Sequence, residues 1–329
     1  MSPEVSVVIP TRNRRDLLTR AVASVLSQQD VRVQILVVDD GSTDGTAEMV
    51  RSWGLSSVAL WRCPESVGVS QARNIGISCA DAPWVAFLDD DDVWAPMKLK
   101  TQLAALAAAP QSRWCCTGAV WIDEAGHLTG FSAPTGAVVT HHDVMAHNTV
   151  PGGGSSVLAE TALLREQGGF APDLALFEDW ELWIRVARSG DGVAIDRPLV
   201  GFRIGNSTTT RNVDGLRLAW GVVAARHAES AINVGVTPDF SALLRFEAFR
   251  YLQSGQYRQA AERYRELGKG SAAAAVRALG PGWRRLQTYR NTRAIPASWR
   301  AEADAWVPIA VRDKVPEGSS CQASLAPPA

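Results

Sequence analysis

The segment FLDDDDVW, residues 87–94, places four carboxylates directly after an apolar stretch. Residues 84–88 have the pattern of a short buried strand, so the carboxylates lie at its carboxyl end, where open α/β sheets bind ligands. Neighbouring carboxylates repel one another unless a hard cation with oxygen ligands neutralises them. The segment therefore predicts a site for a divalent ion and phosphate oxygens. A solvated acidic turn before a helix that begins at Pro96 is the alternative, because negative charge is favourable at a helix N-terminus.

A second acidic turn follows residues 34–38, the second of two strand-like segments. The first covers residues 5–9, and residues 17–26 between them carry apolar side chains on one helical face, which predicts a β-α-β unit. The turn reads DDGSTDGT at residues 39–46 and supplies carboxylates, glycines and capping hydroxyls. A carboxylate at a strand end can accept the N3 hydrogen of a uracil, and nearby hydroxyls suit ribose and phosphate. An ordinary acidic turn with a helix cap is the alternative.

Four N-terminal blocks resemble the signatures of family 2 inverting glycosyltransferases in sequence, order and spacing. They read VIPTRNR at residues 8–14, VVDDGSTD at 37–44, GVSQARNIG at 68–76 and FLDDDDVW at 87–94. A fifth block, with GGF at 168–170 and FEDWELWIR at 177–185, resembles the acceptor-side segment that carries the family's catalytic carboxylate. The resemblance covers roughly residues 4–210. It implies an α/β protein of the GT-A class, with a Rossmann-like mixed sheet flanked by helices, that uses a nucleotide-sugar donor.

The resemblance implies a nucleotide pocket built from the turns that follow the first and second strands. Pro10, Thr11 and Arg14, at the end of the first strand, would line this pocket. Asp39 would hold the base, and Asp40 would support the turn that carries it.

The same resemblance divides the acidic run between the donor sugar and the metal. Asp89 would contact the sugar and ribose and lie beside the metal, Asp90 would belong to the donor site, and Asp91 would bind Mn²⁺ or Mg²⁺. Asp92 is an accessory residue. Arg73 would bond to phosphate or donor sugar by charge-assisted hydrogen bonds, with an arginine on a helix surface as the alternative.

The reaction needs a general base, and Asp179 matches the position of that base in the family. In an inverting transfer a carboxylate deprotonates the acceptor hydroxyl, which attacks the anomeric carbon from the face opposite the diphosphate. Glu178 is expected to support catalysis or acceptor binding. Since residues 182–187 have helical spacing, Asp179 as the N-cap of an amphipathic helix is the alternative.

One feature departs from many relatives. They carry a histidine soon after the arginine of the last core strand, but residues 202–208 read FRIGNST. Asp91 with diphosphate and water still suits Mg²⁺, which commonly keeps several waters. His141, His142 and His147 are expected to be loop or acceptor-side residues rather than metal ligands.

Composition fits a cytoplasmic enzyme. The chain has 329 residues, 46% of them hydrophobic, which allows a sizeable core and favours two domains. A net charge of −1 gives no argument for a nucleic-acid partner. Five cysteines without Cys-X-X-Cys spacing and no secretory leader indicate reduced thiols. No apolar run approaches the length of a membrane span, so any membrane contact would be peripheral, at the inner face.

The segment between the acidic run and the C-terminal third is expected to complete the sheet. Residues 114–122 and 128–131 are expected to pair as a hairpin, and residues 193–195 and 199–203 to add two strands. Residues 151–156 are expected to form a glycine-rich loop or a flexible connector.

The C-terminal third is expected to be helical. The predicted division is a catalytic domain at residues 1–210 ending in Thr208 to Thr210, a helical region at 211–310 and a disordered tail at 311–329. A helical hairpin is expected around Ser254-Gly255. A basic and aromatic stretch is either a solvated helical face or a surface for a membrane or partner. Its residues are Arg277, Arg284, Arg285, Arg290, Arg293 and Arg300, with Trp283, Tyr289 and Trp299.

These patterns together predict a metal-dependent inverting glycosyltransferase. It would move a sugar, most simply from a UDP-sugar, to a hydroxyl of a glycan, lipid-linked or small-molecule acceptor. The alternatives are a non-catalytic nucleotide-sugar binding or scaffold protein, and a nucleotidyltransferase. The second lacks support because residues 10–15 contain arginines but no glycine. The oligomeric state is left open.

Overall fold

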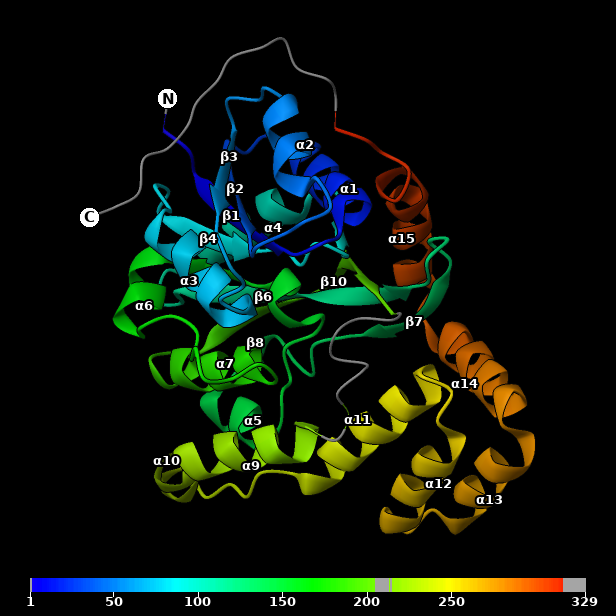
Figure 1. The fold of residues 1–329 in the computed structure, drawn as a ribbon. Helices are drawn as coiled ribbons and strands as arrows, with labels where there is room; N and C mark the ends of the chain where they lie inside the picture. Colours follow the sequence, from blue (N-terminus) through cyan, green and yellow to red (C-terminus); the bar gives the residue numbers. More distant parts are fainter. Residues whose placement is uncertain (1, 205–212, 214, 316–329) are drawn as a thin grey trace.

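The computed structural model describes residues 2–204, 213 and 215–315 of the chain. Its centre is a mixed β-sheet with helices on both faces, and a group of helices from the C-terminal third lies along one side of it (Figure 1). The strand order is β3-β2-β1-β4-β9-β6-β10-β5, with β7 paired to β6 and β8 to β10. Strand order reverses around β1 and β4, a place where open α/β sheets bind ligands.

The N-terminal part of the sheet is parallel, as the β-α-β pattern predicts. Val5 pairs with Val33 on one side and with Trp84 on the other. These strands are buried on both faces, which explains their continuous apolar runs. The strands are β1 (Val5–Thr11), β2 (Val33–Asp39), β3 (Val58–Arg62) and β4 (Trp84–Phe87), and the helices are α1 (Arg15–Leu26), α2 (Thr46–Ser52) and α3 (Val69–Ser78).

The middle of the chain adds the mixed part of the sheet, in which β6 and β10 pair parallel and the other strands pair antiparallel. The strands are β5 (Val93–Trp94), β6 (Trp114–Ile122), β7 (Leu128–Ser132), β8 (Val138–Val139), β9 (Leu158–Glu160) and β10 (Gly192–Arg203). The helices are α4 (Lys98–Ala108), α5 (His141–Ala146), the 3-10 turn η1 (Gly153–Ser156), α6 (Thr161–Glu166) and α7 (Glu178–Arg188).

Three expectations for this part compare directly with the structure. The hairpin is confirmed, since β6 and β7 pair antiparallel. The helix expected from Pro96 begins two residues later, at Lys98. Residues 193–195 and 199–203 were expected as separate strands, but they belong to the single strand β10, whose register shifts between Ile195 and Val200. A bulge of this kind lets one strand bend without leaving the sheet.

Large aromatic side chains fill the core between the sheet and α7. The rings of Trp114 and Trp183 stack with centroids 6.4 Å apart, and Phe87 meets Phe170 edge to face at 5.1 Å. All four side chains are buried. Such pairs add to the stability that their buried area provides. Because Phe87 lies two residues before Asp89, this packing fixes the position of the strand end that carries the carboxylates.

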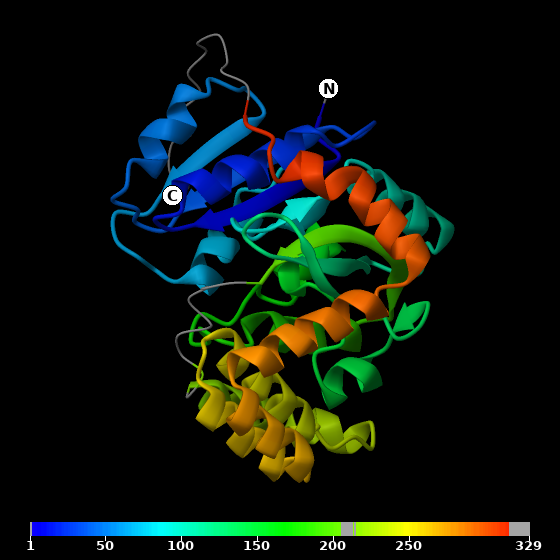
Figure 2. The same ribbon diagram turned by 90° about the vertical axis from the view of Figure 1, so that its right-hand side faces the viewer.

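The C-terminal third is helical, as expected. Its helices are α9 (Gly215–Arg226), α10 (Ala228–Asn233), α11 (Phe240–Gln253), α12 (Tyr257–Glu266), α13 (Gly270–Leu279), α14 (Pro281–Ala294) and α15 (Ala297–Ala310). The hairpin around Ser254-Gly255 is confirmed, and Gly255 has a φ of +74° in the turn between α11 and α12. In Figure 2 the helices α14 and α15 lie on the outside of the molecule and lead from the helical group back to the sheet.

The last helix belongs to the core of the sheet domain. Trp299 in α15 is only 5% exposed and packs with Val120, Ile122 and Leu199. Its indole lies so close to Gly118 that a Cβ there would be 2.0 Å from the ring. Trp299 is therefore a core residue and no part of the basic surface in which the sequence placed it.

The domain division remains a prediction. The proposed end of the catalytic domain, Thr208 to Thr210, lies outside the described residues, as does most of the expected tail. Of that tail only residues 311–315 are described, and Val311 and Val315 are buried.

Candidate active site

The predicted site residues from blocks one, two and four converge at the carboxyl ends of the parallel strands. Thr11 ends β1, Asp39 ends β2 and is its partner in register, and the acidic run follows β4. Pro10 pairs with Val38 in the same ladder. Adjacent parallel strands end on the same edge of a sheet, so segments far apart in sequence form one site.

Asp39 is fully buried, and only one of its two carboxylate oxygens has a hydrogen-bond partner in the described structure. Its Oδ1 accepts a hydrogen bond of 2.8 Å from the backbone N–H of Ser42. Its Oδ2 has no hydrogen-bond partner in the described structure and lies 3.7 Å from Nε of Arg62. A buried acceptor without a donor is costly, so its presence points to a ligand that supplies one.

Asp40 anchors a different loop from the one expected. Its carboxylate accepts hydrogen bonds from Ser66 Oγ at 2.7 Å, from the N–H of Val67 at 2.5 Å and from the N–H of Gly68 at 3.2 Å. These donors precede α3, the helix that carries Arg73. Asp40 therefore ties the end of β2 to the start of α3, in addition to any effect on its own turn.

The acidic run is bound by residues from the end of β1. Thr11 Oγ1 donates to Asp90 at 2.8 Å, and Nη1 of Arg14 lies 2.9 Å from both Asp90 and Asp91. Burial, and then the charge of Asp91, raises the pKa of Asp90 to about 7. Burial also raises the pKa of Asp91, against the opposing effect of Arg14. The four acids of the run thus share two arginine partners in the described structure, Arg14 and Arg73.

Asp92 has a structural role, because it links the acidic run to neighbouring segments. Its carboxylate accepts hydrogen bonds from Ser155 Oγ at 2.6 Å and from the N–H of Arg203 at 2.9 Å, and it is buried. Ser155 Oγ also accepts from the N–H of Asp89 at 3.1 Å. The glycine-rich segment before β9, read from sequence as a loop or connector, thus holds the acidic run in place. Sequence patterns indicated the loop but not this role of Ser155.

Arg73 links the acidic run to the acceptor-side block. Its Nη2 donates to Asp89 at 2.6 Å and its Nη1 to Glu178 at 2.8 Å. Its guanidinium lies over the ring of Phe170, 5.1 Å from the centroid. Burial opposes its charge, but the two carboxylates outweigh burial and raise its pKa. The alternative of a surface arginine is wrong, because only 3% of Arg73 is exposed.

Asp179 does not occupy the capping position that the alternative reading gave it. The N-cap of α7 is Phe177, with a φ of 59°, and Asp179 is the second residue of the helix. Its Oδ1 accepts from the N–H of Trp180 at 2.7 Å, and its Oδ2 accepts from Asn148 at 3.2 Å. A Cβ at Gly153 would lie 3.3 Å from Oδ2, so the glycine leaves room beside this oxygen.

Both acids at the start of α7 are held in surroundings that favour their protonated forms. Burial, opposed by Arg73, raises the pKa of Glu178 to about 7, and Asp179 adds to the rise. Burial likewise raises the pKa of Asp179. A carboxylate with a raised pKa is a stronger base than an exposed one, which suits proton abstraction near neutral pH.

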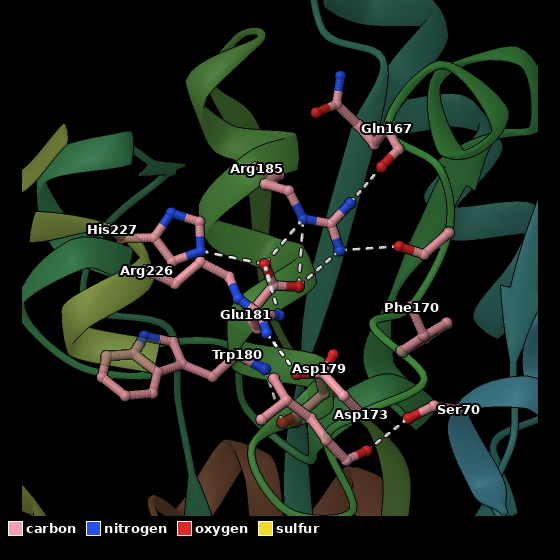
Figure 3. Close-up of polar contacts among 12 residues, drawn as sticks. Ser70, Gln167, Phe170, Asp173, Asp179, Trp180, Glu181, Arg185, Arg226 and His227 are labelled. Carbon is pink, nitrogen blue, oxygen red and sulfur yellow. Dashed lines mark hydrogen bonds and ion pairs between the residues drawn. The ribbon is translucent and has the colours of Figure 1, made fainter. Parts of the chain in front are cut away.

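A buried ion-pair network supports α7 from behind (Figure 3). Glu181 lies between Arg185, at 2.6 Å, and His227, at 3.1 Å from its Nε2. Burial acts to raise the pKa of Glu181, but hydrogen bonds from His227 and Arg185 outweigh it and lower the pKa to about 2. Arg185 also donates to the carbonyl oxygens of Gln167 and, at 2.8 Å, of Gly169. The network fixes α7 against the segment at residues 167–170 and against the C-terminal helices.

The loop at residues 167–174 also forms hydrogen bonds with α3. Asn74 donates to the carbonyl of Phe170 at 2.8 Å and accepts from its N–H at 2.7 Å. Ser70 donates to the carbonyl of Leu174 at 2.8 Å (Figure 3). Blocks three and five, about a hundred residues apart, therefore form one unit on either side of Arg73. The sequence blocks contained these residues, but nothing in their spacing indicated that they contact one another.

His141, His142 and His147 were expected as loop or acceptor-side residues. They lie in α5 or at its end, apart in sequence from the acidic run. His141 and His142 belong to α5, whose N-terminus has a capping box of Thr140 and Asp143. His141 Nε2 lies 3.3 Å from Ser230 Oγ, between α5 and the C-terminal helices.

The described residues fit a metal that is shared with a ligand. Among residues 2–204, 213 and 215–315, no three His, Cys, Asp or Glu side chains are arranged to hold a metal ion. Mg²⁺, however, is commonly bound by one or two carboxylates together with substrate phosphates and water. Asp91 and Asp89, in a cluster with excess negative charge, match that ligand set.

Comparison with known proteins agrees with the family resemblance of the sequence blocks. Residues 6–132 match the family model described as Glycosyl transferase family 2. An uncharacterized glycosyltransferase of Rickettsia felis is 30% identical over 213 residues, 63% of this chain and 34% of the relative. The Escherichia coli UDP-Glc:alpha-D-GlcNAc-diphosphoundecaprenol beta-1,3-glucosyltransferase WfgD is 32% identical over 102 residues, 31% of this chain and 40% of the relative. The chain thus spans about a third of the length of the Rickettsia relative and two fifths of WfgD.

Solved structures share the fold. S. aureus TarS 1–349 in complex with UDP superposes with a TM-score of 0.54 at 17% identity, over 91% of each chain. Mannosyltransferase PcManGT from Pyrobaculum calidifontis, in complex with GDP-Man and Mn²⁺, gives a TM-score of 0.51 at 22% identity, over 94% of this chain and 86% of that one.

The fold is that of the GT-A class, as expected. Within that class, residues 6–132 carry the sequence of glycosyl transferase family 2, and the expected family resemblance and fold are confirmed.

Proposed function

We propose that this protein is a metal-dependent inverting glycosyltransferase that uses a UDP-sugar. The observation that carries the proposal is the buried Oδ2 of Asp39, which lacks a hydrogen-bond donor at the carboxyl end of β2. The N3–H of uracil is a donor of the required kind. TarS is in complex with UDP, and the name of WfgD gives UDP-Glc, which supports the choice of base.

The donor site would use the residues that converge at the strand ends. Pro10 and Thr11 would line the nucleotide pocket, and Arg14 would contact the diphosphate once it is released from part of its ion pairing with Asp90. Asp89 would bind the sugar and ribose. Asp91, with Asp89, would hold Mn²⁺ or Mg²⁺, which when bound neutralises the diphosphate leaving group.

Asp179 would be the general base. Its Oδ2, next to Gly153, would take the proton of an acceptor hydroxyl as that oxygen bonds to the anomeric carbon. The bond from this carbon to the diphosphate breaks on the opposite face, so the configuration inverts. Asn148 would orient the carboxylate, and Arg73 would hold Glu178 and Asp89 at the distance that separates acceptor from donor.

The acceptor would be a hydroxyl of a glycan or of a lipid-linked saccharide, with a small molecule as the remaining option. The name of WfgD, which acts on a diphosphoundecaprenol-linked sugar, supports a lipid-linked acceptor. No helix in the described ranges is long and apolar enough to cross a membrane. We therefore propose a cytoplasmic location with peripheral contact at the inner face of the membrane.

The Asp179→Asn substitution tests the base directly. Asn keeps the hydrogen bond from Trp180 but cannot accept a proton at neutral pH, so transfer should fall by roughly 10² to 10⁴-fold. UDP affinity and melting temperature should stay near those of the wild type, because the donor site lies on other loops. Asp173→Asn is the matched control: its carboxylate lies in the same loop region but is exposed and pairs with Arg226. It should retain activity.

Three results would count against this proposal. Normal transfer by the Asp179→Asn protein would remove Asp179 as the base. UDP-sugar binding without turnover by the wild type, across a panel of glycan and lipid-linked acceptors, would favour the scaffold alternative. Release of pyrophosphate from a nucleoside triphosphate and a sugar phosphate would favour a nucleotidyltransferase.

Metal dependence has its own test. Calorimetry of UDP binding with Mn²⁺, and again with a chelator, should show coupled binding, because an ion bridging Asp91 and diphosphate stabilises both. Asp91→Asn should abolish this coupling while leaving the fold intact. UDP affinity that is independent of metal in the wild type would refute the bridging role of the acidic run.

A further inference from the structure

Helix α14, Pro281–Ala294, exposes two large apolar side chains on its outward face. None of its side chains is fully buried. The side that packs against the protein carries Trp283 and the polar residues Gln287, Thr288 and Thr292, all half-buried. The outward side carries Leu286, which is 42% exposed, and Tyr289, which is 55% exposed. A surface helix of a globular protein normally buries its apolar residues and exposes its polar ones.

The outward face is also strongly basic. Residues 267–300 contain seven basic residues and no acidic one, although the chain as a whole has a net charge of −1. Arg285, Arg290 and Arg293 are exposed, and in the described structure none of them forms an ion pair. The guanidinium of Arg293 lies over the ring of Tyr289, 5.3 Å from its centroid, so basic and aromatic groups share one face.

Some arginines on the neighbouring helices are paired within the protein. Arg217 pairs with Glu247 at 3.0 Å, and Arg263 pairs with the same carboxylate at 2.6 Å. Arg265 on α12 and Arg277 on α13 are exposed and form no ion pair in the described structure. What distinguishes α14 is that its exposed arginines share one face with the exposed side chains of Leu286 and Tyr289.

The helix is held firmly enough to present this face. Thr292 Oγ1 donates to the carbonyl of Leu128 in β7 at 3.3 Å, and the next helix is fixed in the core by Trp299. In Figure 2 α14 lies on the outer surface between the helical group and α15. Its outer side is thus open, while its two ends are attached to packed parts of the molecule.

We propose that the outward face of α14, formed by Arg285, Leu286, Tyr289, Arg290 and Arg293, docks the protein on an anionic lipid surface. Arginines attract anionic headgroups, while an exposed leucine and tyrosine enter the boundary between headgroups and acyl chains. Tyrosine is enriched at that boundary because its ring is apolar and its hydroxyl polar. The inference goes beyond the transfer reaction and does not depend on the donor or acceptor.

A lipid surface fits this face better than the other anionic partners. A second copy of the chain would place one row of unpaired arginines against another, and like charges repel. A nucleic acid would satisfy the arginines but would not bury Leu286. Both remain distinguishable outcomes of the experiment below.

The experiment is sedimentation of the full-length protein with vesicles. Phosphatidylcholine vesicles with phosphatidylglycerol should bind the protein at low salt, and vesicles of phosphatidylcholine alone should bind it weakly. Replacing Arg285, Arg290 and Arg293 together by Gln should weaken partition to anionic vesicles about a hundredfold, since each basic residue near the surface contributes about fivefold. Leu286→Ser with Tyr289→Ser should remove the part of the binding that resists high salt.

A matched control removes the same charge elsewhere. Arg51, Arg188 and Arg312 are exposed and lie at the ends of α2, α7 and α15. Their triple replacement by Gln lowers net charge equally but leaves α14 intact, so vesicle binding should fall by no more than a few-fold through the loss of general attraction. Melting temperatures and UDP binding of both triple variants show that the fold is preserved.

Several outcomes would overturn the proposal. Absence of binding to anionic vesicles at low salt would do so, as would equal binding to neutral vesicles or an equal loss in the control. Tight binding of single-stranded or duplex nucleic acid, abolished by the α14 substitutions while vesicles do not bind, would assign the face to a nucleic acid. A wild-type dimer that the α14 substitutions dissociate would assign it to a second copy.

Discussion

The Asp39→Asn substitution should weaken UDP binding without weakening the fold. In the folded protein Asp39 uses Oδ1 for the N–H of Ser42, while Oδ2 has no hydrogen-bond partner in the described structure. Asn can keep the first interaction through its own oxygen. The second position then becomes an amide N–H₂, a donor, which would face the N3–H of the uracil. Two donors would meet where the carboxylate offered an acceptor.

The structure sets the expected magnitudes. A hydrogen bond to a charged group contributes about 1.5–3 kcal/mol, so the Kd for UDP should rise roughly 10 to 150-fold. The free energy of unfolding should change little. Ser42 keeps its acceptor, and Arg62, the charged group that pairs with Oδ2 in the described residues, is 3.7 Å away and 41% exposed. An ion pair of that kind contributes at most about 1 kcal/mol.

Asp40→Asn provides the contrasting control. The carboxylate of Asp40 accepts three hydrogen bonds from residues 66–68, and the amide would satisfy them less well. That variant should lose about 1–3 kcal/mol of stability. The assay pairs calorimetric titration with UDP and urea unfolding for both proteins. If the Asp39→Asn protein bound UDP as tightly as the wild type, Asp39 would not contact the base and the main support for a uridine donor would be gone.

Three further predictions concern the core. Gly118→Ala places a methyl group against the ring of Trp299 and should destabilise the protein by about 1–3 kcal/mol in urea unfolding, whereas Gly221→Ala, with open space around it, should not. Despite its burial, hydrogen bonds hold the pKa of Glu181 at about 2, so its contribution to stability should vanish as pH falls from 4.5 to 2, and Glu181→Gln should flatten that decline. Burial lowers the pKa of Lys98 to about 7, so wild-type stability should gain as pH rises from 7 towards 10.5; Lys98→Met should lack this gain, and an unchanged pH profile would show that the lysine is not buried as a neutral group.

The sequence alone was sufficient for the elements and for the general place of the site. Continuous apolar runs, separated by one helix of period 3.6, determine β1, α1 and β2, because strands buried on both faces of a parallel sheet carry apolar residues throughout. The carboxylates after residues 38 and 88 had to lie at strand ends. Parallel neighbours bring those ends together, so Asp39 and Asp89 could be assigned to one site from pattern alone.

Roles that depend on contact between distant segments could not be obtained in this way. Arg73 was expected to meet phosphate, but its burial between Asp89 and Glu178 shows in addition that it joins the two halves of the site. Asp179 had the spacing of a helix cap, and only the left-handed backbone of Phe177 moves the start of α7 and frees that carboxylate from capping.

The C-terminal helices illustrate the same division most clearly. The spacing of arginines and aromatic residues in residues 277–300 indicated a helical surface, but it treated Trp299 and Tyr289 alike. Packing separates them: Trp299 fills the space left by Gly118 and is buried, whereas Tyr289 remains exposed beside Arg293. Local periodicity determines which residues share a helix. Only tertiary packing determines which face of that helix the core takes, because burial depends on the surface that a distant part of the chain presents.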